Sequence, residues 1–177
     1  VYTAMNAFYQ TALSFTGQNM GAKKYDRVAK ILRICILCVT VTGVVLGCGA
    51  YLLGTPLLSI YTSDPEVIQY GLERMLIVCV PYFLCGIMDV LVGQLRGLGR
   101  SAVPMAVSII GICGFRIAWI HTYFAAHRTW EVLFWSYPIS WILTASAHFI
   151  CYLIISRKFP KQKAKTEEPA SVRSAVS

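Results

Sequence analysis

The stretch from Ile34 to Ser63 reads ICILCVTVTGVVLGCGAYLLGTPLLSIYTS and contains no charged side chain. An α-helix needs about 20 apolar residues to cross a hydrocarbon core about 30 Å thick. This stretch is long enough to span with some tilt, and its hydrophobicity is continuous rather than alternating. It therefore predicts a transmembrane helix.

The same criterion, applied to the whole chain, predicts an all-α polytopic membrane protein with a transmembrane bundle over residues 1–156. Of the 177 residues, 56% are hydrophobic and 14% charged, with a mean hydropathy of +0.60. Soluble domains have about 25% charged residues, so this chain lacks the polar side chains to cover a soluble surface. The predicted spans lie at approximately 1–20, 34–61, 73–95, 102–124 and 132–155.

Lys and Arg are distributed unevenly between the connectors and give the net charge of +8. They gather in the first connector, in the third connector and in the tail, whereas the other side has only Arg74 and Arg128. The positive-inside rule then places the basic connectors and the C-terminus in the cytosol. Residues 157–177 are predicted to form a disordered cytosolic tail, whose basic residues serve as a topology signal or attract anionic lipids.

The chain begins at Val1 within an apolar run, without a basic region or a cleavage site before it. We therefore expect it to be a piece of a longer protein, with Val1 near the outer face of a plasma membrane. The cysteines all lie in apolar stretches, where they act as small hydrophobic residues. No metal site and no cofactor are expected, and no nucleic acid is expected as a partner.

Asp89 is the one acidic residue within the apolar run from Met75 to Leu95, and no other predicted span contains an acid in its interior, which makes it the first candidate for function. It could bind and release a proton or a cation, or it could be a hydrogen-bonded carboxylate that locks two helices together. Arg116 is the second candidate, either in a cavity or extended towards the outer face. The two residues differ by about 14 Å in depth along their helices, so we do not expect a direct pair.

Small and polar residues predict how the helices pack. Three Gly-x-x-x-Gly pairs, at Gly17/Gly21, Gly43/Gly47 and Gly93/Gly97, would each let another helix approach closely. Pro81 is expected to bend the third span. Gln94, at the end of that span, is expected to act as a helix cap.

Several stretches, taken in order, resemble one family of transporters. They are FTGQNMGAKKYDR (Phe15–Arg27), GQLRGLGRS (Gly93–Ser101) with Pro104 after it, RIAW (Arg116–Trp119) and YPISW (Tyr137–Trp141). Together they are similar to the multidrug and toxic compound extrusion (MATE) family. The resemblance implies a fold of twelve helices in two six-helix lobes, of which this chain would supply the last five.

The resemblance implies secondary antiport, in which Na⁺ or H⁺ moving inward drives export of drugs or organic cations. Some members of the family have a coupling acid in the helix that corresponds to the span of Asp89. As partners, the resemblance implies membrane lipids and a missing N-terminal lobe. A lipid-linked sugar flippase of the same wider superfamily would need a strongly cationic cavity. A third hypothesis is a truncated membrane fragment that does not transport. An enzyme is not expected, because no His, Cys or Ser grouping surrounds Asp89.

Overall fold

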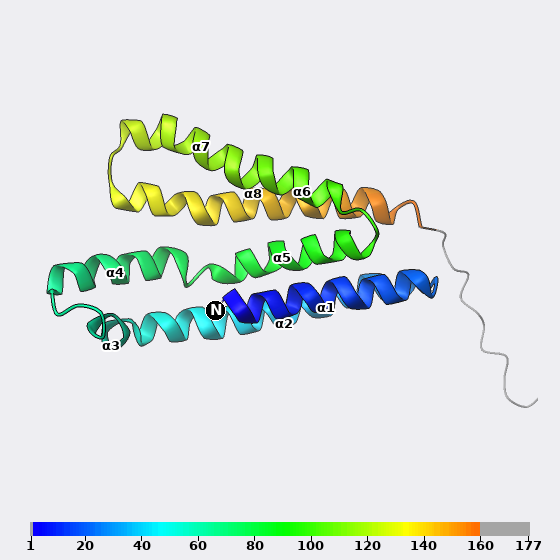
Figure 1. Ribbon diagram of the computed structural model, residues 1–177, viewed down its shortest axis with the longest axis horizontal. Helices are drawn as coiled ribbons and strands as arrows, with labels where there is room; N and C mark the ends of the chain where they lie inside the picture. The colour runs from blue at the N-terminus through cyan, green and yellow to red at the C-terminus, as the bar shows by residue number, and fades with distance from the viewer. Residues whose placement is uncertain (1, 160–177) are drawn as a thin grey trace, which may run out of the picture.

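The computed structural model describes residues 2–159 as a bundle of helices that run along one long axis (Figure 1). In chain order the elements are α1 (Tyr2–Gly21), α2 (Tyr25–Leu52), α3 (Gly54–Ser59), α4 (Pro65–Val78), α5 (Tyr82–Gly97), α6 (Ala102–Ser108), the π-helix η1 (Ile109–Gly114), α7 (Phe115–Trp119), the π-helix η2 (Ile120–Phe124) and α8 (Trp130–Ser156). Residues 160–177 of the predicted tail lie outside the described residues.

Three helical segments of the described chain are long and apolar enough to cross a membrane, namely Tyr25–Leu52, Ala102–Phe124 and Trp130–Ser156. α4 and α5 make a fourth candidate if the two helices, bent by 42°, are counted as one broken span. The first predicted span is helical over α1 but is not among these candidates. The chain is thus a multi-pass membrane protein with three or four candidate spans among residues 2–159, and the count of five expected from sequence stays a prediction.

The second span begins earlier than its predicted start at residue 34. The turn after α1 is confined to Ala22–Lys24, where Lys23 adopts a φ of 57°, and α2 starts at Tyr25. The basic residues of this connector are therefore mostly helical. Lys and Arg are good helix formers, and no Gly or Pro interrupts the chain between Tyr25 and Thr42.

The third predicted span is broken into α4 and α5 at residues 79–81. Pro81 cannot donate a backbone hydrogen bond, and α5 begins at the next residue. α4 begins at Pro65, and its Asp64 cap accepts a hydrogen bond from the Glu66 amide at 2.9 Å. The bend expected at Pro81 is confirmed.

α5 is the central helix of the bundle and packs against α1, α2 and α8. Its contact with α1 depends on glycine, because a Cβ at Gly93 would lie 2.5 Å from the Tyr9 carbonyl oxygen. A Cβ at Gly97 would lie 2.7 Å from Thr16 Cβ. Gly43 allows a similar approach of α2 to Phe83, whereas Gly21 faces open space. Close approach is thus confirmed for two of the glycine pairs. In the third pair, a Cβ at Gly17 would make only ordinary contact with the Gly97 carbonyl oxygen at 3.9 Å, and the expectation is wrong for Gly21.

Candidate functional site

A cavity of about 290 Å³ lies between α1 and α5 and contains Asp89. α1 contributes polar side chains at helical spacing, and α5 contributes one acid and one base on one face. The lining residues are Tyr2, Asn6, Tyr9, Gln10, Asp89, Val92 and Arg96. Two apolar helices thus form an open polar pocket on the described bundle, with Tyr2, Gln10 and Arg96 exposed.

The Asp89 carboxylate is partly buried in this cavity and has no protein partner among residues 2–159, as it neither accepts a hydrogen bond nor forms an ion pair there. The alternative of a carboxylate that locks two helices by hydrogen bonds therefore has no support in the geometry of this region. A half-buried carboxylate without a fixed donor can accept a proton or a cation at low reorganisation cost.

Arg96 shares the cavity with Asp89 but is engaged elsewhere. Its Nη1 atom donates a hydrogen bond of 2.7 Å to the Tyr9 hydroxyl, and its guanidinium lies 5.8 Å from the centre of the Tyr9 ring. Seven residues separate Asp89 from Arg96, which corresponds to about 10 Å along a helix. The only cation in the lining therefore stabilises the α1–α5 contact and leaves the carboxylate free to bind a ligand.

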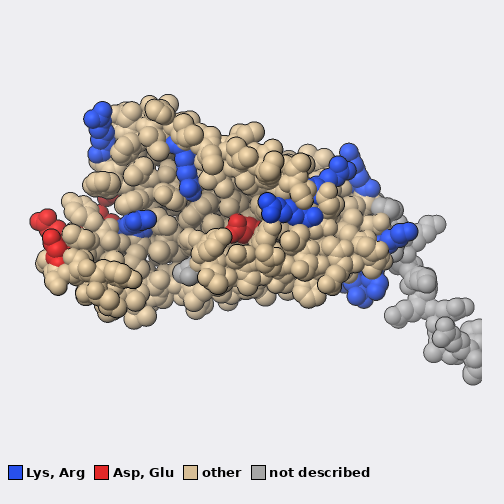
Figure 2. Space-filling view, viewed as in Figure 1, with Lys and Arg blue, Asp and Glu red and all other residues tan. Residues whose placement is uncertain are grey.

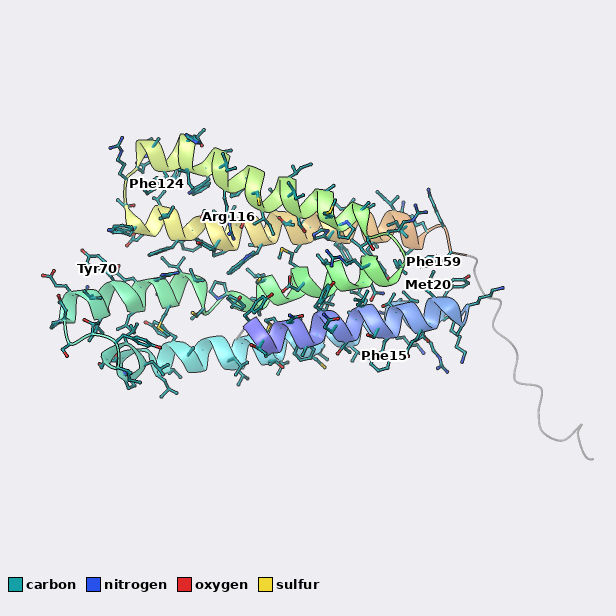
Figure 3. The ribbon with its side chains drawn as sticks, in the orientation of Figure 1. Phe15, Met20, Tyr70, Arg116, Phe124 and Phe159 are labelled. Carbon is teal, nitrogen blue, oxygen red and sulfur yellow. The ribbon has the colours of Figure 1, made fainter. Side chains whose placement is uncertain are left out.

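Arg116 lies on α7 and points towards α8 (Figure 3). Its guanidinium sits 4.1 Å from the centre of the Tyr137 ring, and its Nε donates to the Ser140 hydroxyl at 3.2 Å. The side chain is thus held between two helices, which is neither of the two arrangements considered from sequence. Arg116 does not line the Asp89 cavity, in agreement with the expectation that the two candidates do not pair.

Aromatic rings continue from Arg116 towards α5. Tyr137 meets Trp141 edge-on with centroids 6.1 Å apart, and Trp141 meets Tyr82 in the same way at 5.4 Å. Trp141 is 5% exposed, so this row of rings is packed between helices. The row connects the α7–α8 pair to the first turn of α5, the helix that carries Asp89.

Gln94 is the residue that sequence reasoning placed wrongly. It does not cap α5 but is fully buried, accepting a hydrogen bond from the Thr16 hydroxyl at 2.7 Å and donating to the Val28 carbonyl at 3.0 Å. One amide therefore joins α1, α2 and α5.

The apolar helices define a multi-pass membrane protein, and one of its helix pairs carries an open polar pocket. The MatE family model matches residues 1–120, and the chain belongs to this family of multidrug and toxic compound extrusion transporters. It is a family of transporters and not of enzymes.

Two curated relatives are named as probable multidrug resistance proteins. The chain is 25% identical over 103 residues to YoeA of Bacillus subtilis (strain 168), covering 58% of this chain and 22% of that protein. It is 27% identical over 104 residues to NorM of Thermotoga maritima, covering 59% of this chain and 22% of that protein. The matched part of this chain thus spans about a fifth of the length of these relatives.

Solved structures of one transporter share the fold. A mutant of the Vibrio cholerae MATE transporter VcmN superposes with a TM-score of 0.77 at 24% identity, covering 87% of this chain and 35% of that chain. The bent form of the same transporter gives 0.69 at 21% identity, covering 88% and 38%. The chain therefore has the fold of part of a MATE transporter.

Proposed function

We propose that this chain is part of a secondary antiporter that exports drugs or organic cations in exchange for Na⁺ or H⁺, with Asp89 as an ion-coupling residue. The observation that carries the proposal is the unpaired Asp89 carboxylate in a polar cavity between two helices of a chain in this family. The names of the two curated relatives support the multidrug substrate class.

The cavity gives no comparable support to a lipid-linked sugar flippase. Its lining combines one carboxylate with one guanidinium, whereas a site for a lipid-linked diphosphate needs an excess of cations. Arg116, the other cation considered, is held against Tyr137 and Ser140. We propose that Arg116 positions α7 on α8 rather than binding the substrate.

We further propose that the chain forms the last five helices of the C-terminal lobe, with α4 and α5 as one broken span. The basic connectors support a cytosolic C-terminus in the plasma membrane. In this arrangement the exposed polar face of α1, which includes Gln10, lies towards the other lobe of the transporter.

The proposal is tested by Asp89→Asn in the intact transporter, with Asp26→Asn as the matched control. Asn keeps the shape of Asp but cannot take up a proton or balance a cation. We expect ion-driven efflux of a cationic dye to fall at least about tenfold, since one lost charge interaction is worth more than about 1.4 kcal/mol. Efflux is measured in everted membrane vesicles at matched protein levels.

Asp26 is exposed on α2 and does not line the Asp89 cavity, so its Asn variant should transport normally. Wild-type efflux in the Asp89→Asn variant would refute the coupling role.

Expression of residues 1–177 alone should give no efflux above background, because a single partial lobe cannot enclose a transport path. Efflux from that fragment would show that the second lobe is not required.

A further inference from the structure

A second cavity, of about 360 Å³, lies at the end of the bundle where four chain segments meet. It is bounded by the last turns of α1 and α8, by the α5–α6 connector and by the first turn of α6. Met20 and Phe159, which line it, lie close together at this end in Figure 3. The cavity is separate from the Asp89 site, with which it shares no lining residue.

The charged lining of this cavity is entirely cationic. Arg100 and Lys158 contribute to it, and no acidic residue does. Both side chains are exposed, and neither forms an ion pair within residues 2–159. Figure 2 shows blue side chains and no red at this end of the visible face, whereas red lies in the middle and at the opposite end, where blue is also present. The local potential therefore attracts an anion.

The rest of the lining is apolar. Leu98, Val103 and Ile155 accompany Met20 and Phe159 beneath the two cations. These apolar side chains would add nothing to the binding of a free inorganic anion, because they make no favourable interaction with phosphate. The combination of two cations above apolar side chains fits an amphiphile with an anionic head.

Phe159 also lines a larger groove of about 700 Å³ between α2 and α8. The walls of this groove are mainly aliphatic and aromatic, including Leu32, Phe149 and Tyr152. Phe159 stacks on Tyr25 at the end of the groove, with ring centroids 5.4 Å apart. A mostly apolar groove, whose lining also includes Asp26 and Arg33, thus adjoins the cationic cavity across one shared side chain.

We propose that this end of the bundle binds an anionic phospholipid, with its phosphate on Arg100 and Lys158 and one acyl chain in the groove between α2 and α8. The helix ends involved are those that the distribution of Lys and Arg assigns to the cytosolic leaflet, where anionic lipids lie. The lipid bridges α8 to the α5–α6 connector. The site is independent of ion coupling at Asp89.

The test uses the intact transporter, purified in detergent and titrated with phosphatidylglycerol or phosphatidylcholine while bound lipid is counted by native mass spectrometry. We expect phosphatidylglycerol to be retained in preference to phosphatidylcholine. The Arg100→Gln/Lys158→Gln variant should bind phosphatidylglycerol about 30-fold more weakly. Each cation near a lipid surface raises the affinity about fivefold, and the variant removes two of them.

The matched control is Arg27→Gln/Lys30→Gln, which removes the same charge from exposed positions of α2 that line neither cavity. Its affinity should change by less than about threefold, because salt screens distant exposed charges. Equal losses in both double variants, or no preference for phosphatidylglycerol in the wild type, would overturn the proposal. Displacement of the lipid by millimolar inorganic phosphate would assign the site to a free anion and would also overturn it.

Discussion

The α1–α5 contact and the contact of the α6–η2 segment with α8 represent two different ways of joining helices in one bundle. α5 buries Gly86, Met88, Val90, Leu91 and Leu95 together with Gly93 and Gln94. In the segment from α6 to η2, residues 102–124, Pro104 is the only buried residue. The first contact depends on backbones in close approach at several glycines. The second has one close approach, of Gly111 to the Thr144 side chain, and otherwise depends on separate side-chain pairs.

The second contact uses specific side-chain pairs. Arg116 reaches Tyr137 and Ser140, and the Trp119 indole donates to the Val132 carbonyl at 3.0 Å. Ser108 is hydrogen-bonded to the buried ring of His148 at 3.2 Å. Such pairs hold a helix in place without fixing every residue along it. The π-helical turns of η1 and η2 lie in the same segment, as is common where a helix must adjust to its neighbours.

The largest effect is expected from Gly93→Leu, which breaks the α1–α5 contact. A Cβ there would already meet the Tyr9 carbonyl oxygen at 2.5 Å, and backbone atoms cannot move aside as a flexible side chain can. We expect a loss of more than about 3 kcal/mol of unfolding free energy, and hence little folded transporter. Fluorescence-detected gel filtration measures the yield of folded transporter, and thermal unfolding measures its stability.

Gly21→Leu is the matched control, since nothing lies within 4 Å of a Cβ added at Gly21. It introduces the same side chain at the end of the same helix pair and should leave the folded yield unchanged. If the two variants behaved alike, the close packing of α1 on α5 would not be what stabilises this half of the bundle.

The comparison also explains how far the sequence could predict the structure. The helical segments follow from long apolar runs, and the break before α5 follows from Pro81, because both depend on local chemistry. The sequence does not show which glycine pairs contact another helix. Gly21 and Gly93 occur in similar motifs and differ only in whether a helix lies opposite them. The start of α2 was also missed, because hydropathy marks the apolar part of a helix and not its basic extension.

The sequence points to one residue of the candidate site but not to the residues around it, because those depend on how the helices pack. Asp89 stands out as an acid in an apolar run, but the polar face of α1 that completes its cavity depends on which helices are neighbours. The role of Gln94 required three helices to be placed together. Sequence thus identifies the unusual residue, and only the packing identifies what surrounds it.

A smaller effect is expected from Gln94→Leu, which removes the amide that joins three helices at the same contact. The Val28 carbonyl then loses its side-chain donor, and the Thr16 hydroxyl loses its acceptor in a buried place. We expect a destabilisation of about 1–2 kcal/mol, measured by thermal or denaturant unfolding in detergent. The exposed Gln69→Leu is the control and should change little.

A double-mutant cycle sharpens this test. Thr16→Val alone leaves the Gln94 Oε1 atom without its donor, whereas Thr16→Val combined with Gln94→Leu removes both partners of that bond. The double variant should therefore be more stable than the sum of the single losses implies. Strict additivity would mean that the two side chains are not coupled as the 2.7 Å distance indicates.

The smallest of these effects is expected from Arg116→Gln, which loosens the α7–α8 contact and leaves α1–α5 intact. The lost interactions are a guanidinium over the Tyr137 ring and one hydrogen bond to Ser140, together worth about 0.5–2 kcal/mol. Because the contact is made by separate pairs, the change should be local. Hydrogen exchange should become faster over residues 102–124 and stay unchanged in α1 and α5.

The control is Arg128→Gln, which removes the same charge at an exposed position in the loop before α8. It should change neither the stability nor the hydrogen exchange of residues 102–124. Faster exchange in α5 would instead show that the row of rings through Trp141 and Tyr82 couples the two halves of the bundle.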